Sequence, residues 1–169
     1  MKKRKPWETR QATVVFFIKH CYSDDPQILM GPKGNGPVNG FLMAPGGRME
    51  KTDLGYTFTG YREAFEECNL RPLGSRKVAE LRVRVKKKRS KVIIHVIECT
   101  NWTGRLRKKD PAFKWLRFIP ISKIPWDQVP TGEDVWMKRV LTNRKKCLVR
   151  IACGKNRHDV KNVDTRPLP

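Results

Sequence analysis

The stretch PGGRMEKTDLGYTFTGYREAFEECNL, from Pro45 to Leu70, decides the fold of this chain. It predicts a glycine turn, a loop and a short helix that carries three glutamates, Glu63, Glu66 and Glu67. Positions i, i+3 and i+4 share one face of a helix, so these carboxylates lie in one small volume. Three negative charges that close repel one another unless a cation lies between them. Because Mg²⁺ prefers oxygen ligands and keeps substrate phosphates in its remaining positions, the pattern predicts a magnesium site for a phosphorylated substrate.

The same stretch resembles the Nudix box, the motif of a family of hydrolases that cleave nucleoside diphosphates linked to another group. The family pattern is Gly, five residues, Glu, seven residues, and then Arg-Glu-apolar-any-Glu-Glu-any-Gly-apolar. Gly47 begins the match, Asp53 takes the first acidic position, and the run from Arg62 to Leu70 supplies the end. The chain departs from the pattern in three ways: Asp53 replaces a glutamate, eight residues instead of seven precede Arg62, and Asn69 stands where glycine is usual.

Two of these departures are physically mild. Asn is the next best residue after Gly for the left-handed position that ends a helix, so Asn69 fits there. The extra residue lies in the loop before the glutamates, where insertions are tolerated. Asp53 is shorter than a glutamate, and the sequence leaves open whether it reaches Arg62 to brace the helix. A glutamate pair on a helix is by itself more often a solvated face, but the whole combination is far narrower.

The resemblance implies a role for each residue of the box. Glu63 and Glu67 would be the main ligands of Mg²⁺, or of Mn²⁺ in its place, and Glu66 would assist them. The carbonyl of Gly46 would add a ligand, because only glycine lets the backbone approach that closely. Arg62 would orient the glutamates through a bidentate pairing.

Beyond the box, the order of elements resembles the MutT-like branch of the family, which hydrolyses oxidised purine nucleoside triphosphates to monophosphate and pyrophosphate. This resemblance is looser but nearly full length, and it includes the segment from His95 to Leu141. It implies that Asn39 contacts the base, or that Met43 takes its place, because four residues, Leu42 to Pro45, precede the glycine pair. It also implies a further acid at Asp110, a ligand or a base, for which a solvated loop acid is the stronger alternative.

The MutT-like branch reads the base with two adjacent acids after a Trp-Pro pair. Here Glu133 and Asp134 follow Pro130, and no tryptophan precedes that proline. A carboxylate that faces a purine edge accepts a hydrogen bond from an amino group, or donates one if it is protonated. Acids in the first turn of a helix also interact favourably with its dipole. The substrate-binding and the purely structural interpretations of these two acids stand equally.

The remaining patterns predict an α/β fold in which a mixed, curved sheet lies between helices. Ala12 to Ile18 is β-branched and aromatic, and Glu80 to Lys86 alternates before its hairpin partner, Lys91 to Cys99. At 169 residues we expect one domain over residues 11–169, after a basic disordered tail over residues 1–10. The other predicted elements are strands at Gln27–Met30, Lys114–Ile119, Cys147–Cys153 and Asp159–Val163, a glutamate helix capped by Thr57 or Thr59, and a helix within Gly132–Lys145.

The charge balance is strongly basic, with 37 Lys and Arg against 16 Asp and Glu and a net charge of +21. Such a field attracts polyanions. An RNA-binding surface and an unusually basic exterior are equally good interpretations. The basic residues cluster at Lys2–Lys5, Arg82–Lys91, Arg105–Lys109 and Arg144–Lys146.

The five cysteines show no paired metal spacing and indicate the reduced thiols of an intracellular protein. No apolar run approaches the ~18 residues of a membrane span. The first residues, MKKRKPW, lack the apolar region of a signal peptide, so we expect a cytoplasmic protein, with a nuclear address as the alternative.

Three hypotheses about function follow. The first is a hydrolase of free nucleoside triphosphates, with an oxidised purine such as 8-oxo-dGTP as the expected base. The second keeps this chemistry but acts on the 5′ end of RNA, as a decapping or pyrophosphate-removing enzyme. The third is an RNA-binding module that has kept the fold and lost activity. The charge favours the second hypothesis, and the nearly full-length resemblance favours the first. The three glutamates argue against the third hypothesis.

Overall fold

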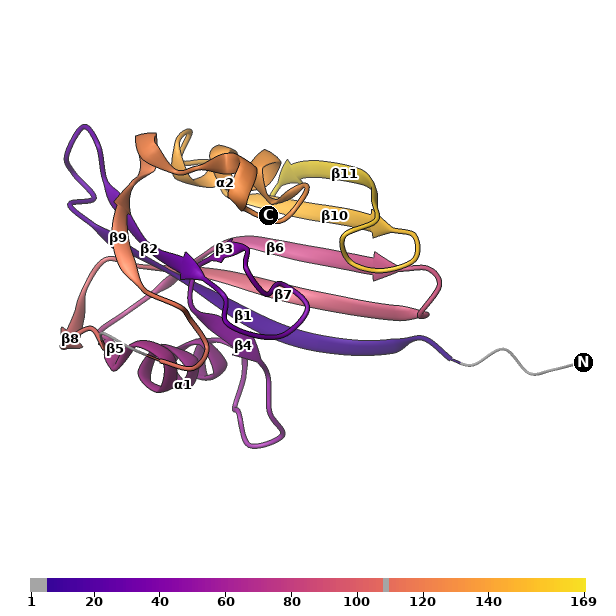
Figure 1. Ribbon diagram of the computed structural model, residues 1–169, viewed down its shortest axis with the longest axis horizontal. Coiled ribbons are helices and arrows are strands. Elements are labelled where there is room, and N and C mark those ends of the chain that lie inside the picture. Colours follow the sequence, from indigo (N-terminus) through magenta and orange to yellow (C-terminus); the bar gives the residue numbers. More distant parts are fainter. Residues whose placement is uncertain (1–5, 108–109) are drawn as a thin grey trace, which may run out of the picture.

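A large mixed β-sheet with one helix on each face forms the centre of the computed structural model, which describes residues 6–107 and 110–169 (Figure 1). The main strand order is β11-β10-β6-β7-β1-β2-β3, with β4 beside β1 and β9 beside β2. A separate two-stranded sheet joins β5 and β8. The elements are β1 (Glu8–Lys19), β2 (Gln27–Pro32), β3 (Leu42–Met43), β4 (Gly46–Arg48), α1 (Tyr56–Cys68), β5 (Leu70–Pro72), β6 (Arg76–Val85), β7 (Ser90–Cys99), β8 (Trp102–Gly104), β9 (Arg117–Pro120), the 3₁₀ turns η1 (Ile121–Lys123) and η2 (Trp126–Gln128), α2 (Glu133–Leu141), β10 (Cys147–Cys153) and β11 (Val160–Pro167).

Strand β1 organises the sheet. It runs parallel to β7 along one edge, with Val14 opposite Val96. Its other edge is divided, because β4 pairs with residues 12–14 and β2 pairs with residues 18–19. This division places the glycine pair of β4 directly against the middle of the longest strand.

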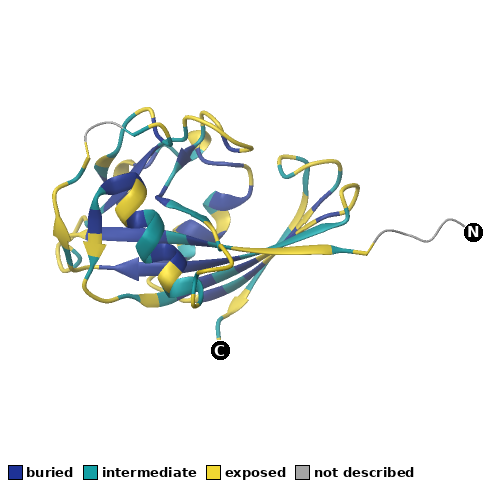
Figure 2. Cartoon of the chain, turned by 90° about the horizontal axis from the view of Figure 1, so that it is seen from below, coloured by how far each residue is buried: buried dark blue, intermediate teal, exposed yellow. Residues whose placement is uncertain are grey.

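The core lies on both faces of β1, as its run of apolar residues predicts. Phe16 and Ile18 belong to the cluster on the α2 face, where Phe16 stacks on Trp136 with ring centroids 5.8 Å apart. Val15 and Phe17 pack on the α1 face. Phe16 and Phe17 are at most 1 % exposed, and each such burial stabilises the fold by about 1.5–3 kcal/mol. The buried residues of Figure 2 accordingly concentrate between the helices.

The glutamate helix begins earlier than we predicted. Helix α1 starts at Tyr56 after Gly55, and no side chain caps it, so the capping role predicted for Thr57 or Thr59 is wrong. Thr59 is fully buried, and its Oγ1 lies 2.9 Å from Asp53 Oδ2. The predicted end of α1 at Asn69 is confirmed. Asn69 adopts the left-handed conformation with φ 58°, and its backbone N–H donates to Ala64 O and Phe65 O.

Several boundaries differ from the sequence-based expectation. Strand β1 begins at Glu8, so residues 8–10 belong to the sheet instead of a disordered tail, while residues 1–5 of that tail lie outside the described residues. Helix α2 ends at Leu141, before Arg144 takes a left-handed φ of 55°, and Val135 is 49 % exposed. The β6–β7 and β10–β11 hairpins are confirmed. Within the described residues, none of the helices has both the length and the apolar character that crossing a membrane requires.

Candidate active site

The glycine pair allows the backbone and a carboxylate to occupy space that side chains would fill. Gly46 has a φ of 153°, and a Cβ there would lie 2.2 Å from Thr13 O. A Cβ on Gly47 would lie 2.2 Å from Glu63 Oε1. Gly46 N–H also donates to Glu67 Oε2 at 2.9 Å. The glycine turn therefore seats the two glutamates that lie one helical turn apart.

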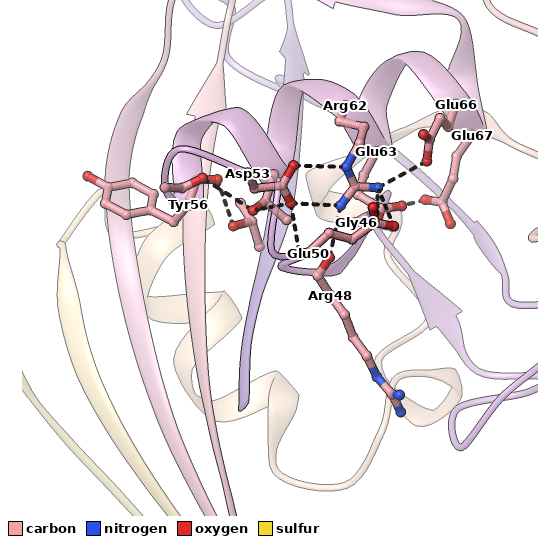
Figure 3. Close-up of polar contacts among 12 residues, drawn as sticks. Gly46, Arg48, Glu50, Asp53, Tyr56, Arg62, Glu63, Glu66 and Glu67 are labelled. Atoms are coloured by element: carbon pink, nitrogen blue, oxygen red, sulfur yellow. Dashed lines mark hydrogen bonds and ion pairs between the residues drawn. The ribbon is translucent and has the colours of Figure 1, made fainter. Parts of the chain in front are cut away.

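Asp53 reaches Arg62 despite its short side chain. Arg62 Nε donates to Asp53 Oδ1 at 3.0 Å, and Nη2 donates to Oδ2 at 2.9 Å, which makes a bidentate pair (Figure 3). Asp53 also accepts a hydrogen bond from Glu50 N–H. The hydrogen bonds from Arg62 hold the pKa of Asp53 well below its usual range. The one-residue insertion and the shorter acid leave the brace on the helix intact.

Arg62 also contacts two glutamates of α1, Glu63 and Glu66. Its Nη1 donates to Glu63 Oε1 at 2.9 Å and to Glu66 Oε2 at 3.1 Å, and its Nη2 donates to Arg48 O. We predicted that the bidentate pairing of Arg62 would involve the glutamates, but it involves Asp53. Burial raises the pKa of Glu63, and the nearby Arg62 opposes this shift.

A lysine that the sequence analysis missed contacts the third acid. Lys33 Nζ donates to Glu67 Oε1, and both side chains are nearly buried, at 12 % and 10 % exposed. The same ammonium lies 4.1 Å from the centroid of the Phe113 ring. Burial raises the pKa of Glu67, and Lys33 and the Gly46 N–H oppose the shift. The only available signal was a lysine in a glycine-rich loop near the box.

Asp110 lies at the same site. Asp110 forms an antiparallel bridge with Phe113, whose ring lies under the Lys33 ammonium that pairs with Glu67. The Asp110 side chain is only 10 % exposed, and it accepts from Ala112 N–H at 2.8 Å and from Arg107 Nη1 at 3.3 Å. Asp110 is therefore not the solvated loop acid that we considered the stronger alternative.

The predicted base-contacting residues separate in space. Glu133 is buried and lines a narrow apolar cavity on the α2 face of β1, together with Met43 and Trp136. Trp136 Nε1 donates to Glu133 Oε2 at 2.8 Å, and burial raises the pKa of Glu133. Asp134 lies at the surface, 3.5 Å from Lys138 Nζ. Asn39 is exposed in the loop before β3 and does not line this cavity.

Comparison with solved structures identifies the fold. A mutator MutT protein from Bacillus halodurans superposes with a TM-score of 0.78 at 18 % identity, covering 95 % of this chain and 99 % of that one. A MutT protein from Methanosarcina mazei Go1 gives a TM-score of 0.66 at 16 % identity, covering 86 % and 100 %. The chain has the Nudix fold. The NUDIX domain of Shewanella oneidensis NrtR, solved with ADP ribose, superposes with a TM-score of 0.63 at 15 % identity, covering 83 % of this chain and 89 % of that one.

Sequence comparison adds no relative, because no protein-family model and no curated protein sequence matches this chain. The Nudix fold was nevertheless predicted from the box, and its three glutamates lie on α1, with Glu63 beside Gly47. Identity below one fifth demonstrates the fold alone, so the chemistry depends on the site itself.

The donor set of the Nudix fold fits a hard divalent cation, since Glu63, Glu66 and Glu67 supply only oxygen atoms. Their present contacts are with basic groups: Arg62 pairs with Glu63 and Glu66, and Lys33 pairs with Glu67. Among the described residues, no group of three or more acid, His or Cys side chains is arranged around one point. A metal held by these glutamates would compete with the Lys33 ammonium for Glu67.

Proposed function

We propose that this chain is a Mg²⁺-dependent hydrolase that cleaves a nucleoside triphosphate to a monophosphate and pyrophosphate. The observation that carries the proposal is the fit of Glu63 into the space left by the missing side chain of Gly47, one helical turn from Glu67. An acidic helix matched to a glycine turn in this way is what a cation bound to phosphates needs. The fold shared with MutT proteins supports an oxidised purine such as 8-oxo-dGTP as the base.

The residues of the chain divide the work. Glu63 and Glu67 would hold the metal, with Glu66 and the Gly46 carbonyl as further oxygen donors, while Arg62 and Asp53 keep the helix in place. When bound, the metal neutralises charge on the phosphate oxygens and lowers the pKa of the attacking water.

Two neighbouring groups complete the phosphate site. Once Glu67 faces the metal, the ammonium of Lys33 is available to pair with a substrate phosphate. Asp110, on the segment that borders Lys33, is proposed as a further ligand or as a base.

In this proposal the cavity beside α2, about 20 Å³ in volume, widens to receive the purine base. Its walls include Met43 and Trp136, which offer apolar contact to a flat ring. Because burial favours the neutral form of Glu133, this group can donate a hydrogen bond to the base edge as well as accept one. Asn39 and Asp134 do not line this cavity.

The test is hydrolysis of a panel of nucleoside triphosphates with Mg²⁺, with pyrophosphate as the readout. We expect Glu67→Gln to reduce turnover by roughly 100-fold or more, since it removes the charge that holds the metal. Glu8→Gln makes the same chemical change on an exposed residue of β1 and should leave turnover unchanged. Unchanged turnover in Glu67→Gln would mean that the metal assignment is wrong.

The 5′ end of RNA is the second candidate substrate, and the net charge of +21 favours it. The same assay with 5′-triphosphorylated RNA separates the candidates, because activity confined to RNA supports this second one. Absence of turnover on either substrate would support a non-catalytic RNA-binding module. We also infer a cytoplasmic location, or a nuclear one if the basic N-terminus acts as an address, because all five thiols are free.

A further inference from the structure

A basic groove crosses the α1 face of the sheet where the strands extend past the helix. We call it the sheet groove. In Figure 1, strands β1, β6 and β7 run to the right beyond α1, and in Figure 2 this part of the sheet has no helix over it. Odd-numbered residues of β1 face α1, since Val15 and Phe17 pack against that helix, and the groove residue Thr9 lies in the same series. The side chains that line the sheet groove are Thr9, Arg82, Arg84, Lys91, Ile93, Arg150, Ala152 and Asn162.

The register of three strands brings the cations together. Arg84 of β6 lies opposite Lys91 of β7, and Arg82 lies opposite Arg150 of β10. Among the described residues, Arg84, Lys91 and Arg150 form no ion pair with a carboxylate, whereas Arg82 pairs with Glu80. Asp164 of β11 lies opposite Arg150, whereas Arg84 and Lys91 face each other directly, and a bound polyanion would relieve the repulsion between these two cations.

The aromatic residue Trp7 lies beside two of the cations that line the sheet groove. The Trp7 ring centroid lies 5.7 Å from the Arg84 guanidinium carbon, 5.6 Å from that of Arg89 and 5.5 Å from Lys91 Nζ. Trp7 is two residues before Thr9, so it continues the same face of the chain. The basic track continues through Lys86–Lys88, which are exposed in the β6–β7 turn. A track of cations that ends at an indole offers both phosphate contacts and a stacking surface.

We propose that the sheet groove binds single-stranded RNA, with its phosphates on Arg84, Lys91 and Arg150 and a base on Trp7. The cations require a polyanion, and the indole favours one that carries bases over heparin or an anionic membrane. The hydroxyl of Thr9 and the amide of Asn162 lie among the cations and can hydrogen-bond a 2′-OH, which favours RNA over DNA.

The sheet groove and the proposed active site lie on the same side of the sheet. Gly47 pairs with Thr13 of β1, and Lys91 pairs with Thr9 of the same strand. Four residues of strand separate these points by about 13 Å. Binding of RNA in the groove does not depend on hydrolysis.

The experiment is fluorescence anisotropy of the full chain with a 12-nucleotide single-stranded RNA that carries a 5′-hydroxyl and cannot serve as a triphosphate substrate. The test variant is Arg84→Gln/Lys91→Gln/Arg150→Gln. The matched control, Arg105→Gln/Lys123→Gln/Lys145→Gln, removes the same charge from exposed residues outside the groove. Arg150→Gln alone, at an exposed strand position, is a milder variant that keeps the test valid if the triple variant does not fold. Trp7→Ala tests stacking.

We expect the test variant to weaken RNA binding on the order of tenfold or more beyond the control, and to lower the slope of log affinity against log salt by about 2. Trp7→Ala should weaken binding about fivefold or more. Equal losses of RNA affinity in the two triple variants would overturn the proposal that the sheet groove binds RNA. Equal affinity for RNA, for DNA of the same sequence, for heparin and for anionic vesicles would overturn it too. Glu67→Gln should bind RNA normally, so failure of the groove and failure of the proposed hydrolysis give different results.

Discussion

The two faces of β1 hold acids in opposite ways. On the α1 face, Glu63, Glu66 and Glu67 share two cations, Arg62 and Lys33, and Glu63 fills the space beside Gly47 in the glycine turn. On the α2 face, the single acid Glu133 lies among mostly apolar side chains, with Trp136 Nε1 at 2.8 Å and one cation, Arg157, at 3.5 Å.

This difference teaches what each acid is suited to do. A cluster of carboxylates with exchangeable cations is suited to bind a metal, because the metal replaces charge that is already present. A single buried carboxylate is suited to exchange a proton with a ligand, because burial brings its neutral form within reach. Four changes test or sharpen this comparison.

The largest effect is expected from Gly47→Ala. The new Cβ would lie 2.2 Å from Glu63 Oε1, so the carboxylate must leave its position beneath the turn. We expect hydrolysis to fall by roughly 100-fold, with a small change in melting temperature, because only the end of a flexible side chain has to move. In a Glu63→Gln background the same change should add little, since both changes affect one group. Additive losses would show that Gly47 acts by another route.

Asp53→Asn should destabilise the fold. Asp53 accepts two hydrogen bonds from Arg62 and one from Glu50 N–H, so we expect a loss of about 1–3 kcal/mol in the free energy of unfolding. The pKa of Asp53 is lowered in the fold, so its contribution is complete above the unfolded value of 3.8 and is lost as the pH falls below it. Urea unfolding at pH 7 and pH 2.5 measures this, and a difference between variant and parent that does not shrink in acid would contradict it.

Substitutions at Glu133 should separate charge from hydrogen bonding. Glu133→Ala leaves the buried Trp136 Nε1 without its acceptor and should cost about 1–3 kcal/mol, whereas Glu133→Gln keeps an acceptor and should cost less. Burial raises the pKa of Glu133 above its usual value of 4.5. The contribution of Glu133 to stability is therefore complete below pH 4.5, and it is lost as the pH rises through the pKa that the group has in the folded protein. In thermal unfolding, the melting temperature of Glu133→Gln should therefore rise relative to that of the parent as the pH increases from 4.5 to 7. A constant difference would show that Glu133 stays charged.

The smallest effect is expected from Lys33→Met. Removing the ammonium frees Glu67 from its ion pair, so we expect Mg²⁺ to bind several-fold more tightly in the absence of substrate. Thermal shift against Mg²⁺ concentration measures this affinity, and Lys123→Met, an exposed lysine after β9, is the control. Weaker Mg²⁺ binding in Lys33→Met would show that the lysine organises the site instead of competing for it.

Local sequence patterns predicted the elements that local physics controls. Alternation placed the β6–β7 hairpin, and the apolar run of β1 indicated a strand buried on both faces. Asn69 ends α1 in the left-handed conformation, as its residue type favours. The predictions that failed concern the ends of elements. The expected threonine cap of α1 is absent, because the Thr59 hydroxyl hydrogen-bonds instead to Asp53 and to the Gly55 carbonyl.

The sequence by itself determined the acidic helix, the glycine turn and the basic charge, because each depends on residue type and short spacing. Only the tertiary structure showed that Asp53 reaches Arg62, that Lys33 occupies the side of Glu67, and that Arg84, Lys91 and Arg150 share one face. Strand register and loop path bring these groups together from distant positions, and no local pattern encodes such distances.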